Sequence, residues 1–86
     1  MAQTITGTVT SSSDGAALPG VSVIEKGTTN GTSTDASGKF TVSVSGQQSV
    51  LMVSFIGYAT QEIAVGSRTQ IDVVLEEDVT QLTEVV

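Results

Sequence analysis

The chain has 86 residues and a net charge of −6, and it contains neither cysteine nor histidine. This length allows one small domain. The missing residue types exclude disulfides, thiol chemistry, imidazole acid–base catalysis and the usual zinc ligands. Only three residues are cationic, so the chain has no basic patch for nucleic acid or for an anionic membrane surface. We therefore expect a protein that is not an enzyme, with no cofactor, no metal site and no nucleic-acid partner.

Short segments of alternating apolar and polar residues follow one another along the chain, separated by Gly, Ser, Asn, Asp or Pro. Threonine, serine, valine and glycine dominate, which is typical of β-structure. The pattern predicts strands over residues 4–10, 20–26, 32–34, 39–45, 49–56, 60–65 and 69–76. Seven short strands indicate a β-sandwich. No apolar run approaches the roughly 20 residues of a membrane helix, so no direct membrane insertion is expected.

The period of two also predicts which side chains face inward, because alternate residues of a strand lie on opposite faces of the sheet. The expected core consists of Ile5, Val9, Val21, Val23, Phe40, Val42, Val44, Leu51, Val53, Phe55, Ile63, Val65, Ile71, Val73 and Leu75. These positions would form the inner faces of two sheets.

Residues 18–40 have the pattern of β-hairpins. The stretch from Asp35 to Gly38 predicts a turn in which the Asp35 side chain caps its own loop and Gly38 takes a positive φ. A calcium loop is the alternative, but it needs several carboxylates and this stretch has one. Gly27 and Gly31 suggest a phosphate-binding loop, yet no helix follows them and no lysine has the required spacing. We interpret them as a second hairpin connection.

Two further motifs have a structural and a functional interpretation. Lys26 or Lys39 with Asn30 would suit an intramolecular isopeptide bond, whereas lysines on sheets usually solvate an edge. Tyr58 follows a glycine at a strand end, and we expect its ring to cover the sandwich with its hydroxyl bonded to the backbone. Stacking of a ligand on Tyr58 is the alternative, although a lone aromatic is a poor platform.

The character of the chain changes after Leu75. Residues 76–78 are all acidic, and residues 79–86 contain no turn that would return the chain to the sheet. We expect a domain over residues 1–77 and an acidic, extended linker over residues 78–86. An enzymatic role would require a carboxylate pair such as Asp72 with Glu62, close together and with strongly shifted pKa values.

Several separate segments together resemble one known family. They are TITGTVT, LPGVSVIEKGTTNGTSTDASGKFTVSV, LMVSFIGYATQEIAV and IDVVLEED, and they cover nearly the whole chain in order. The sequence resembles a carboxypeptidase-regulatory-like domain, in the version that begins SusC-like TonB-dependent outer-membrane transporters. This resemblance implies an all-β, seven-stranded antiparallel Greek-key β-sandwich of the transthyretin-like (prealbumin-like) type.

The resemblance also implies a role and a location. The domain is expected to be a non-catalytic accessory of a nutrient transporter for glycans or peptides, at the periplasmic face of the outer membrane. Its expected partners are the plug and barrel of the parent transporter, and TonB or other envelope proteins. The residues expected to make the TonB-related contact are Leu82, Thr83, Glu84, Val85 and Val86. The alternative is a structural stalk or adhesion module of a secreted or cell-surface protein.

Overall fold

The predicted strands are present in the computed structural model, which describes residues 3–78. Within this range the strands are β1 (Gln3–Ser11), β2 (Ser22–Glu25), β3 (Gly31–Ser33), β4 (Lys39–Val44), β5 (Val50–Ser54), β6 (Gln61–Ala64) and β7 (Val73–Leu75). Each predicted strand is confirmed, and most are shorter than predicted. Residues 3–78 contain no helix that is long and apolar enough to cross a bilayer.

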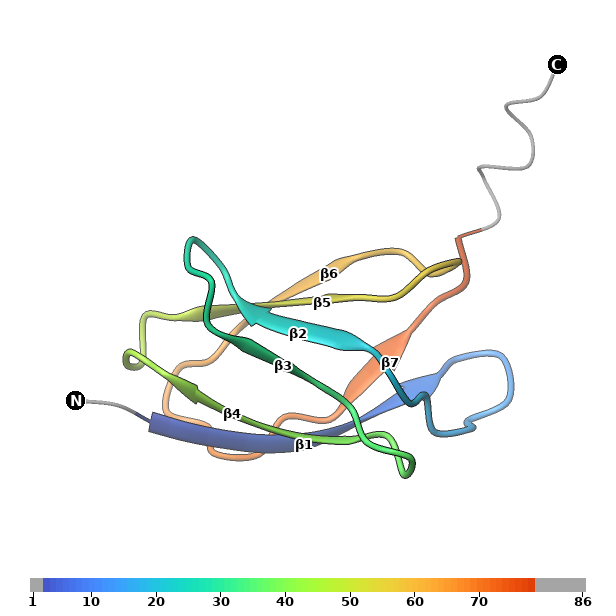
Figure 1. Cartoon of the computed structure of the whole chain (residues 1–86), viewed down its shortest axis with the longest axis horizontal. Coiled ribbons are helices and arrows are strands. Elements are labelled where there is room, and N and C mark those ends of the chain that lie inside the picture. The colour runs from blue at the N-terminus through green and yellow to red at the C-terminus, as the bar shows by residue number, and fades with distance from the viewer. Residues whose placement is uncertain (1–2, 79–86) are drawn as a thin grey trace, which may run out of the picture.

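Two sheets face each other to form a sandwich (Figure 1). One sheet has the order β4-β1-β7, and the other has the order β3-β2-β5-β6. The first and last described strands therefore lie side by side, with β1 in the middle of its sheet. The all-β, seven-stranded sandwich expected from the sequence is confirmed.

One strand pair departs from the antiparallel prediction, because β7 runs parallel to β1. Residues 65–72 carry the chain from the end of β6 across to the other sheet, where the backbone N–H of Thr6 donates to the carbonyl of Thr69 at 2.9 Å. Residues 69–72 thus come alongside the N-terminal half of β1, and the chain then runs in the same direction as β1. Residues 69–72 touch β1 here without a continuous ladder, so β7 begins later than predicted.

The turn over residues 35–38 has the predicted chemistry, but the two strands that it joins do not pair with each other. It joins β3 to β4, which belong to different sheets, so it is a connection between layers and not a hairpin. The other predicted hairpin is confirmed, since β2 pairs antiparallel with β3 across residues 26–30. Local sequence predicts the turn, whereas the sheet that each arm joins depends on the rest of the chain.

Apolar side chains from both sheets fill the space between them. The buried hydrophobic residues are Ile5, Val9, Val21, Val23, Phe40, Val42, Val44, Leu51, Val53, Val65, Ile71, Val73 and Leu75, all of them predicted. The other two predicted core residues, Phe55 and Ile63, are partly buried against this cluster. Burial of each such aliphatic side chain contributes about 1.5–3 kcal/mol, so the alternation of the sequence supplies the main stabilising force.

Candidate functional site

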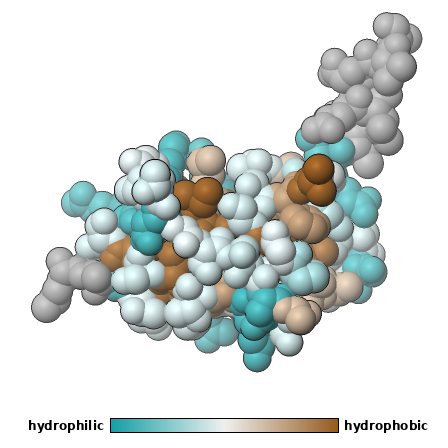
Figure 2. All heavy atoms as spheres, viewed as in Figure 1, coloured by the Kyte–Doolittle hydropathy of each residue, from teal (hydrophilic) through white to brown (hydrophobic). Residues whose placement is uncertain are grey.

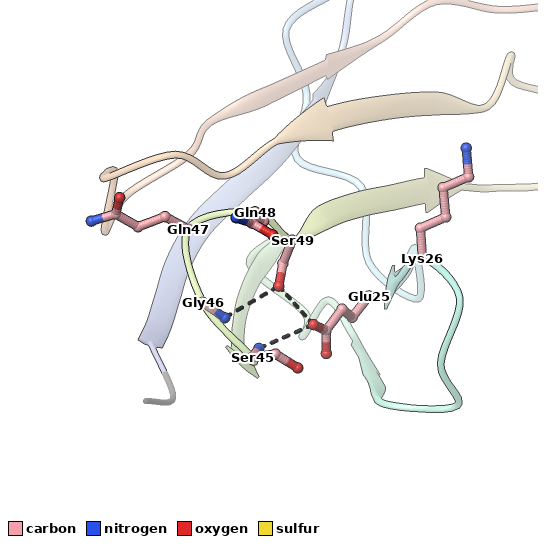
Figure 3. A pocket seen from close by; sticks show the side chains of 7 residues that line it. All are labelled: Glu25, Lys26, Ser45, Gly46, Gln47, Gln48 and Ser49. Carbon is pink, nitrogen blue, oxygen red and sulfur yellow. Dashed lines mark hydrogen bonds between the residues drawn. The ribbon is translucent and has the colours of Figure 1, made fainter.

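A polar cavity of about 570 Å³ opens at one end of the sandwich, between the end of β2 and the loop that joins β4 to β5 (Figure 3). Its walls are Glu25, Lys26 and residues 45–49. Figure 3 shows the Glu25 side chain turned toward Ser45 and Ser49, while Lys26 extends away from it. The cavity is therefore built around one carboxylate.

Glu25 is almost fully buried, with 5% of its surface exposed. Its Oε2 accepts hydrogen bonds from the Ser49 hydroxyl at 2.7 Å and from the Ser45 backbone N–H at 3.0 Å. Its Oε1 accepts a third bond from the Asn30 side-chain amide at 3.2 Å. These bonds favour the ionised carboxylate, the Ser49 hydroxyl most of all, and they lower the pKa of Glu25 to about 2. Glu25 is thus a fixed anion at neutral pH.

The Glu25 cluster, which consists of Glu25, Asn30, Ser45 and Ser49, bonds to the outer edge of β4 near its C-terminal end. The Val9 N–H donates to the Gly38 carbonyl at 2.8 Å, so Val9 and Gly38 form a hydrogen-bonded pair of β1 and the start of β4. Hydrogen-bonded and non-bonded pairs alternate along antiparallel strands. The backbone groups of every second residue from Lys39 to Ser45 therefore point away from β1. Glu25 accepts the outward N–H of Ser45, and Asn30 donates to the outward carbonyl of Ser43. The cluster therefore ties the two sheets together and blunts an edge that would otherwise pair with another strand.

Asp35 has the matching role at the other end of β4. Its Oδ1 accepts the backbone N–H groups of Lys39 at 3.0 Å and of Ser37 at 2.8 Å. These two bonds, that of Lys39 first, hold the pKa of Asp35 below its ordinary value. Gly38 has a φ of 76°, so the predicted capped turn is confirmed. Residues 3–78 hold no group of three or more His, Cys, Asp or Glu side chains that could bind a metal ion.

Tyr58 partly covers the core, as predicted, and its ring lies 5.8 Å from that of Phe55. Its hydroxyl donates to the Ser11 side-chain oxygen at 3.2 Å. The expected bond to the backbone is therefore wrong. Ser11 is buried at the end of β1 and offers the hydroxyl an acceptor that local sequence does not reveal.

The remaining candidate pairs have other partners. The Lys26 ammonium forms a salt bridge of 3.0 Å with Glu62, which the enzymatic alternative paired with Asp72. The amide of Asn30, required for an isopeptide bond with a lysine, is bonded to Glu25 instead. These side chains have structural partners and do not form a reaction centre.

The predicted partner-binding residues, Leu82, Thr83, Glu84, Val85 and Val86, lie outside the described residues. The structure adds two residues that the sequence reasoning missed, Glu25 and Ile56. Glu25 shares its phase with Val21 and Val23, so the alternation places a carboxylate inside and could have indicated a buried, hydrogen-bonded anion. Ile56 follows β5 and is 89% exposed, although the sequence favoured a strand to this residue.

This fold, with carboxylates that serve as structural caps, defines a small β-sandwich module. A model of the CarboxypepD_reg-like domain matches residues 5–86, and the chain belongs to this family. The resemblance found from the sequence is confirmed.

Curated relatives place the domain in larger proteins. The chain is 53% identical over 85 residues, 99% of its length, to one TonB-dependent receptor of Formosa agariphila, and 46% identical over 82 residues, 95% of its length, to another. It is also 46% identical over 67 residues, 78% of its length, to the TonB-dependent receptor SusC of Bacteroides thetaiotaomicron. It spans 8% of each Formosa receptor and 6% of SusC. The chain is thus a domain of the kind found in SusC-like TonB-dependent receptors.

Solved structures with the same fold are more distant in sequence. A chain in an N-terminal interface mutant of a type II cohesin–X-dockerin complex from Acetivibrio cellulolyticus superposes with a TM-score of 0.72 at 22% identity, covering 87% of this chain and 58% of that one. The corresponding C-terminal interface mutant gives 0.65 at 23% identity, covering 85% and 56%. At this identity the likeness concerns the fold alone.

Proposed function

We propose that this chain is a non-catalytic accessory and interaction domain of a TonB-dependent outer-membrane transporter of glycans or peptides, at the periplasmic face of the membrane. The observation that carries the proposal is that 95–99% of the chain is 46–53% identical to TonB-dependent receptors. The chain spans only 8% of the length of each of these receptors. A module of this relative size contributes to the receptor without being the transport path.

The chemistry of the carboxylates supports a non-catalytic role. A general acid or base works best when its pKa lies near the working pH. The hydrogen bonds around Glu25 instead lower its pKa to about 2, and those around Asp35 also lower its pKa. Both groups use their charge to hold loops in place.

The C-terminal segment is the proposed contact with TonB. In this proposal residues 1–77 form the domain, residues 78–86 form the linker, and residues 82–86 make the contact. The backbone N–H of Asp78 donates to the carbonyl of Gly57 at 3.0 Å, which anchors the start of the linker on the sandwich. An extended segment of alternating side chains can then add to the edge of a partner sheet. The plug and barrel of the parent receptor are the other expected partners.

A titration of the ¹⁵N-labelled full chain with the periplasmic domain of TonB from the same organism tests this proposal. We expect amide signals of residues 82–86 to change while those of the strands stay in place. Leu82→Lys should weaken binding at least tenfold, because an extended segment contributes pockets for alternate side chains. Thr80→Lys adds the same charge outside the predicted contact and serves as the matched control.

Three results would contradict the proposal. Signals that change only within residues 3–78 would refute the assignment of residues 82–86, as would equal binding by Leu82→Lys and Thr80→Lys. Removal of residues 1–77 from the parent receptor should slow nutrient uptake. Unchanged uptake would favour the alternative of a stalk or adhesion module.

A further inference from the structure

The turn that follows β5 presents an isoleucine to solvent. The Tyr58 backbone N–H donates to the Phe55 carbonyl at 3.1 Å, and Gly57 takes a φ of 84° to close the turn. Phe55 and Tyr58 pack against the core, but Ile56 is 89% exposed. The turn requires the glycine and the core uses the two rings, so no packing within the fold accounts for isoleucine at position 56.

This apolar residue does not stand alone. Phe55 and Tyr58, on either side of it, are only partly buried. Figure 2 shows strongly hydrophobic atoms beside the point where the described chain stops, as well as elsewhere on this face. Isolated exposed apolar residues are ordinary, whereas a contiguous patch with a polar rim marks interaction sites.

The rim of this patch is acidic. Residues 76–78 run antiparallel to residues 57–59, through bonds from the Ala59 N–H to the Glu76 carbonyl at 2.9 Å and from the Asp78 N–H to the Gly57 carbonyl at 3.0 Å. Glu76 and Glu77 are exposed. The carboxylates are thus held beside the apolar turn by the backbone of the fold.

Two of the three cationic residues lie at the opposite end of the sandwich. The Lys26 N–H donates to the Val50 carbonyl, where β5 begins, and the Arg68 side chain donates to the carbonyls of Ala64 and Val65, where β6 ends. The turn with Ile56 follows the far end of β5. These two cations are therefore far from Glu76 and Glu77, and the potential of the two glutamates around the turn attracts cations.

We propose that Phe55, Ile56 and Tyr58, with Glu76 and Glu77, form a docking surface, the 55–58 surface, for a basic linear segment of a partner protein. An apolar side chain of the partner packs on Ile56, and flanking Lys or Arg side chains face the two glutamates. A second copy of this chain carries a net charge of −6 and is repelled. The segment over residues 79–86 has no cation to offer the glutamates. The surface is independent of residues 82–86, so the inference goes beyond the proposed contact with TonB.

The test is an NMR titration of the ¹⁵N-labelled full chain with the synthetic hexapeptide KKLVKK at low ionic strength. A patch this small is far below the roughly 800 Å² per partner of stable interfaces, so we expect a Kd on the order of 0.1 mM. Amide signals of residues 56–59 and 76–78 should move. Raising the salt concentration to about 0.3 M should weaken binding several-fold, because exposed charges are screened.

Matched variants and a second peptide separate the apolar contact from charge alone. Ile56→Ser should weaken binding at least fivefold without a change in Tm, since its side chain is exposed. Val74→Thr removes another exposed apolar side chain, 51% exposed on β7, and should bind as the unmodified chain does. The peptide KKSSKK should bind at least fivefold more weakly than KKLVKK.

Five results would each overturn the inference. Four of them are equal binding of the two peptides, equal binding by Ile56→Ser and the unmodified chain, signal changes confined to other surfaces, and concentration-dependent shifts at residues 56–59 without peptide, which would indicate a second copy. A change in the signals of residues 79–86 on Ile56→Ser without peptide would instead assign the surface to this chain's own segment, and would also refute the proposal.

Discussion

Gly7 lies at a tightly packed backbone position of the three-stranded sheet, and its replacement by alanine gives a sharp test of the packing. Gly7 is in β1, opposite Phe40 of β4, and residues 70–71 run along its other side. A Cβ added to Gly7 would lie 1.8 Å from the Ile71 carbonyl oxygen and 2.8 Å from Cε2 of Phe40. The phenyl ring can turn aside, but the carbonyl belongs to backbone that is bonded to Thr6 at 2.9 Å.

The expected cost follows from the balance of two effects. Alanine restricts the unfolded chain and gains about 0.4–1 kcal/mol where its backbone conformation fits. Overpacking that displaces backbone costs about 1–3 kcal/mol and occasionally more. An approach of 1.8 Å to a carbonyl oxygen belongs at the upper end, so after the gain is subtracted we expect Gly7→Ala to lose about 2 kcal/mol net. For a domain of this size the Tm then falls by about 8–16 °C.

Urea unfolding measures this loss directly. The chain has one tyrosine and no tryptophan, so fluorescence of Tyr58 reports unfolding, and far-UV circular dichroism provides a second probe. Gly15→Ala is the matched control, because Gly15 has a φ of 71° but nothing within 4 Å of an added Cβ. It should cost about 1–2 kcal/mol, from the left-handed backbone alone. A Gly7→Ala variant more stable than Gly15→Ala would refute the reasoning about the close approach.

Two further predictions concern hydrogen bonds. The folded pKa of Glu25 is about 2 and its ordinary value is 4.5, so the stabilisation by the carboxylate is complete above pH 4.5 and is lost as the pH falls toward 2. Glu25→Gln should therefore lower the Tm at pH 7, and its difference from the unmodified chain should narrow between pH 4.5 and 2; a constant difference would contradict the ionic role. Tyr58→Phe removes the bond to Ser11 and should cost about 0.5–1.5 kcal/mol in urea unfolding followed by circular dichroism. Ser11→Ala also removes the bonds of its hydroxyl to Ser13, so it has a cost of its own. The two changes together should nevertheless cost less than the sum of the single changes, and full additivity would argue against the bond.

Alternation of side chains carried most of the information about the core. Residues such as Val21 and Val23 are wholly buried because each strand has one face toward the opposite sheet. The alternation of apolar and polar residues in the sequence identifies that face. Phe55 and Ile63 have the same phase but are only partly buried; Phe55 lies just after β5, and Ile63 lies on β6, at the edge of its sheet. Strand phase predicts orientation, whereas the depth of burial depends on which elements meet.

Strand partners and the site were less accessible to prediction. Nothing in the local pattern of Val73 to Leu75 states that β7 lies beside β1 or runs parallel to it, because pairing depends on where the chain crosses between sheets. The bonds of Glu25 show the same limit, since Ser49 is 24 residues away along the chain. Tyr58 likewise finds its partner 47 residues away. The side chains could be marked as candidates, but their partners follow only from topology.

The edges of the three-stranded sheet bear on how this domain meets other proteins. Glu25 and Asn30 bond to the outer edge of β4 near its C-terminal end, and Asp35 bonds to its start. The outer edge of β7 is covered by residues 57–61, through the Ala59–Glu76 backbone bond and the Gln61 amide on the Val74 carbonyl. An added strand would have to displace these bonds, so this sheet is poorly suited to pairing with a partner. Both proposed contacts instead begin where the chain leaves the sandwich, one at the 55–58 surface and the other along the segment that follows Asp78.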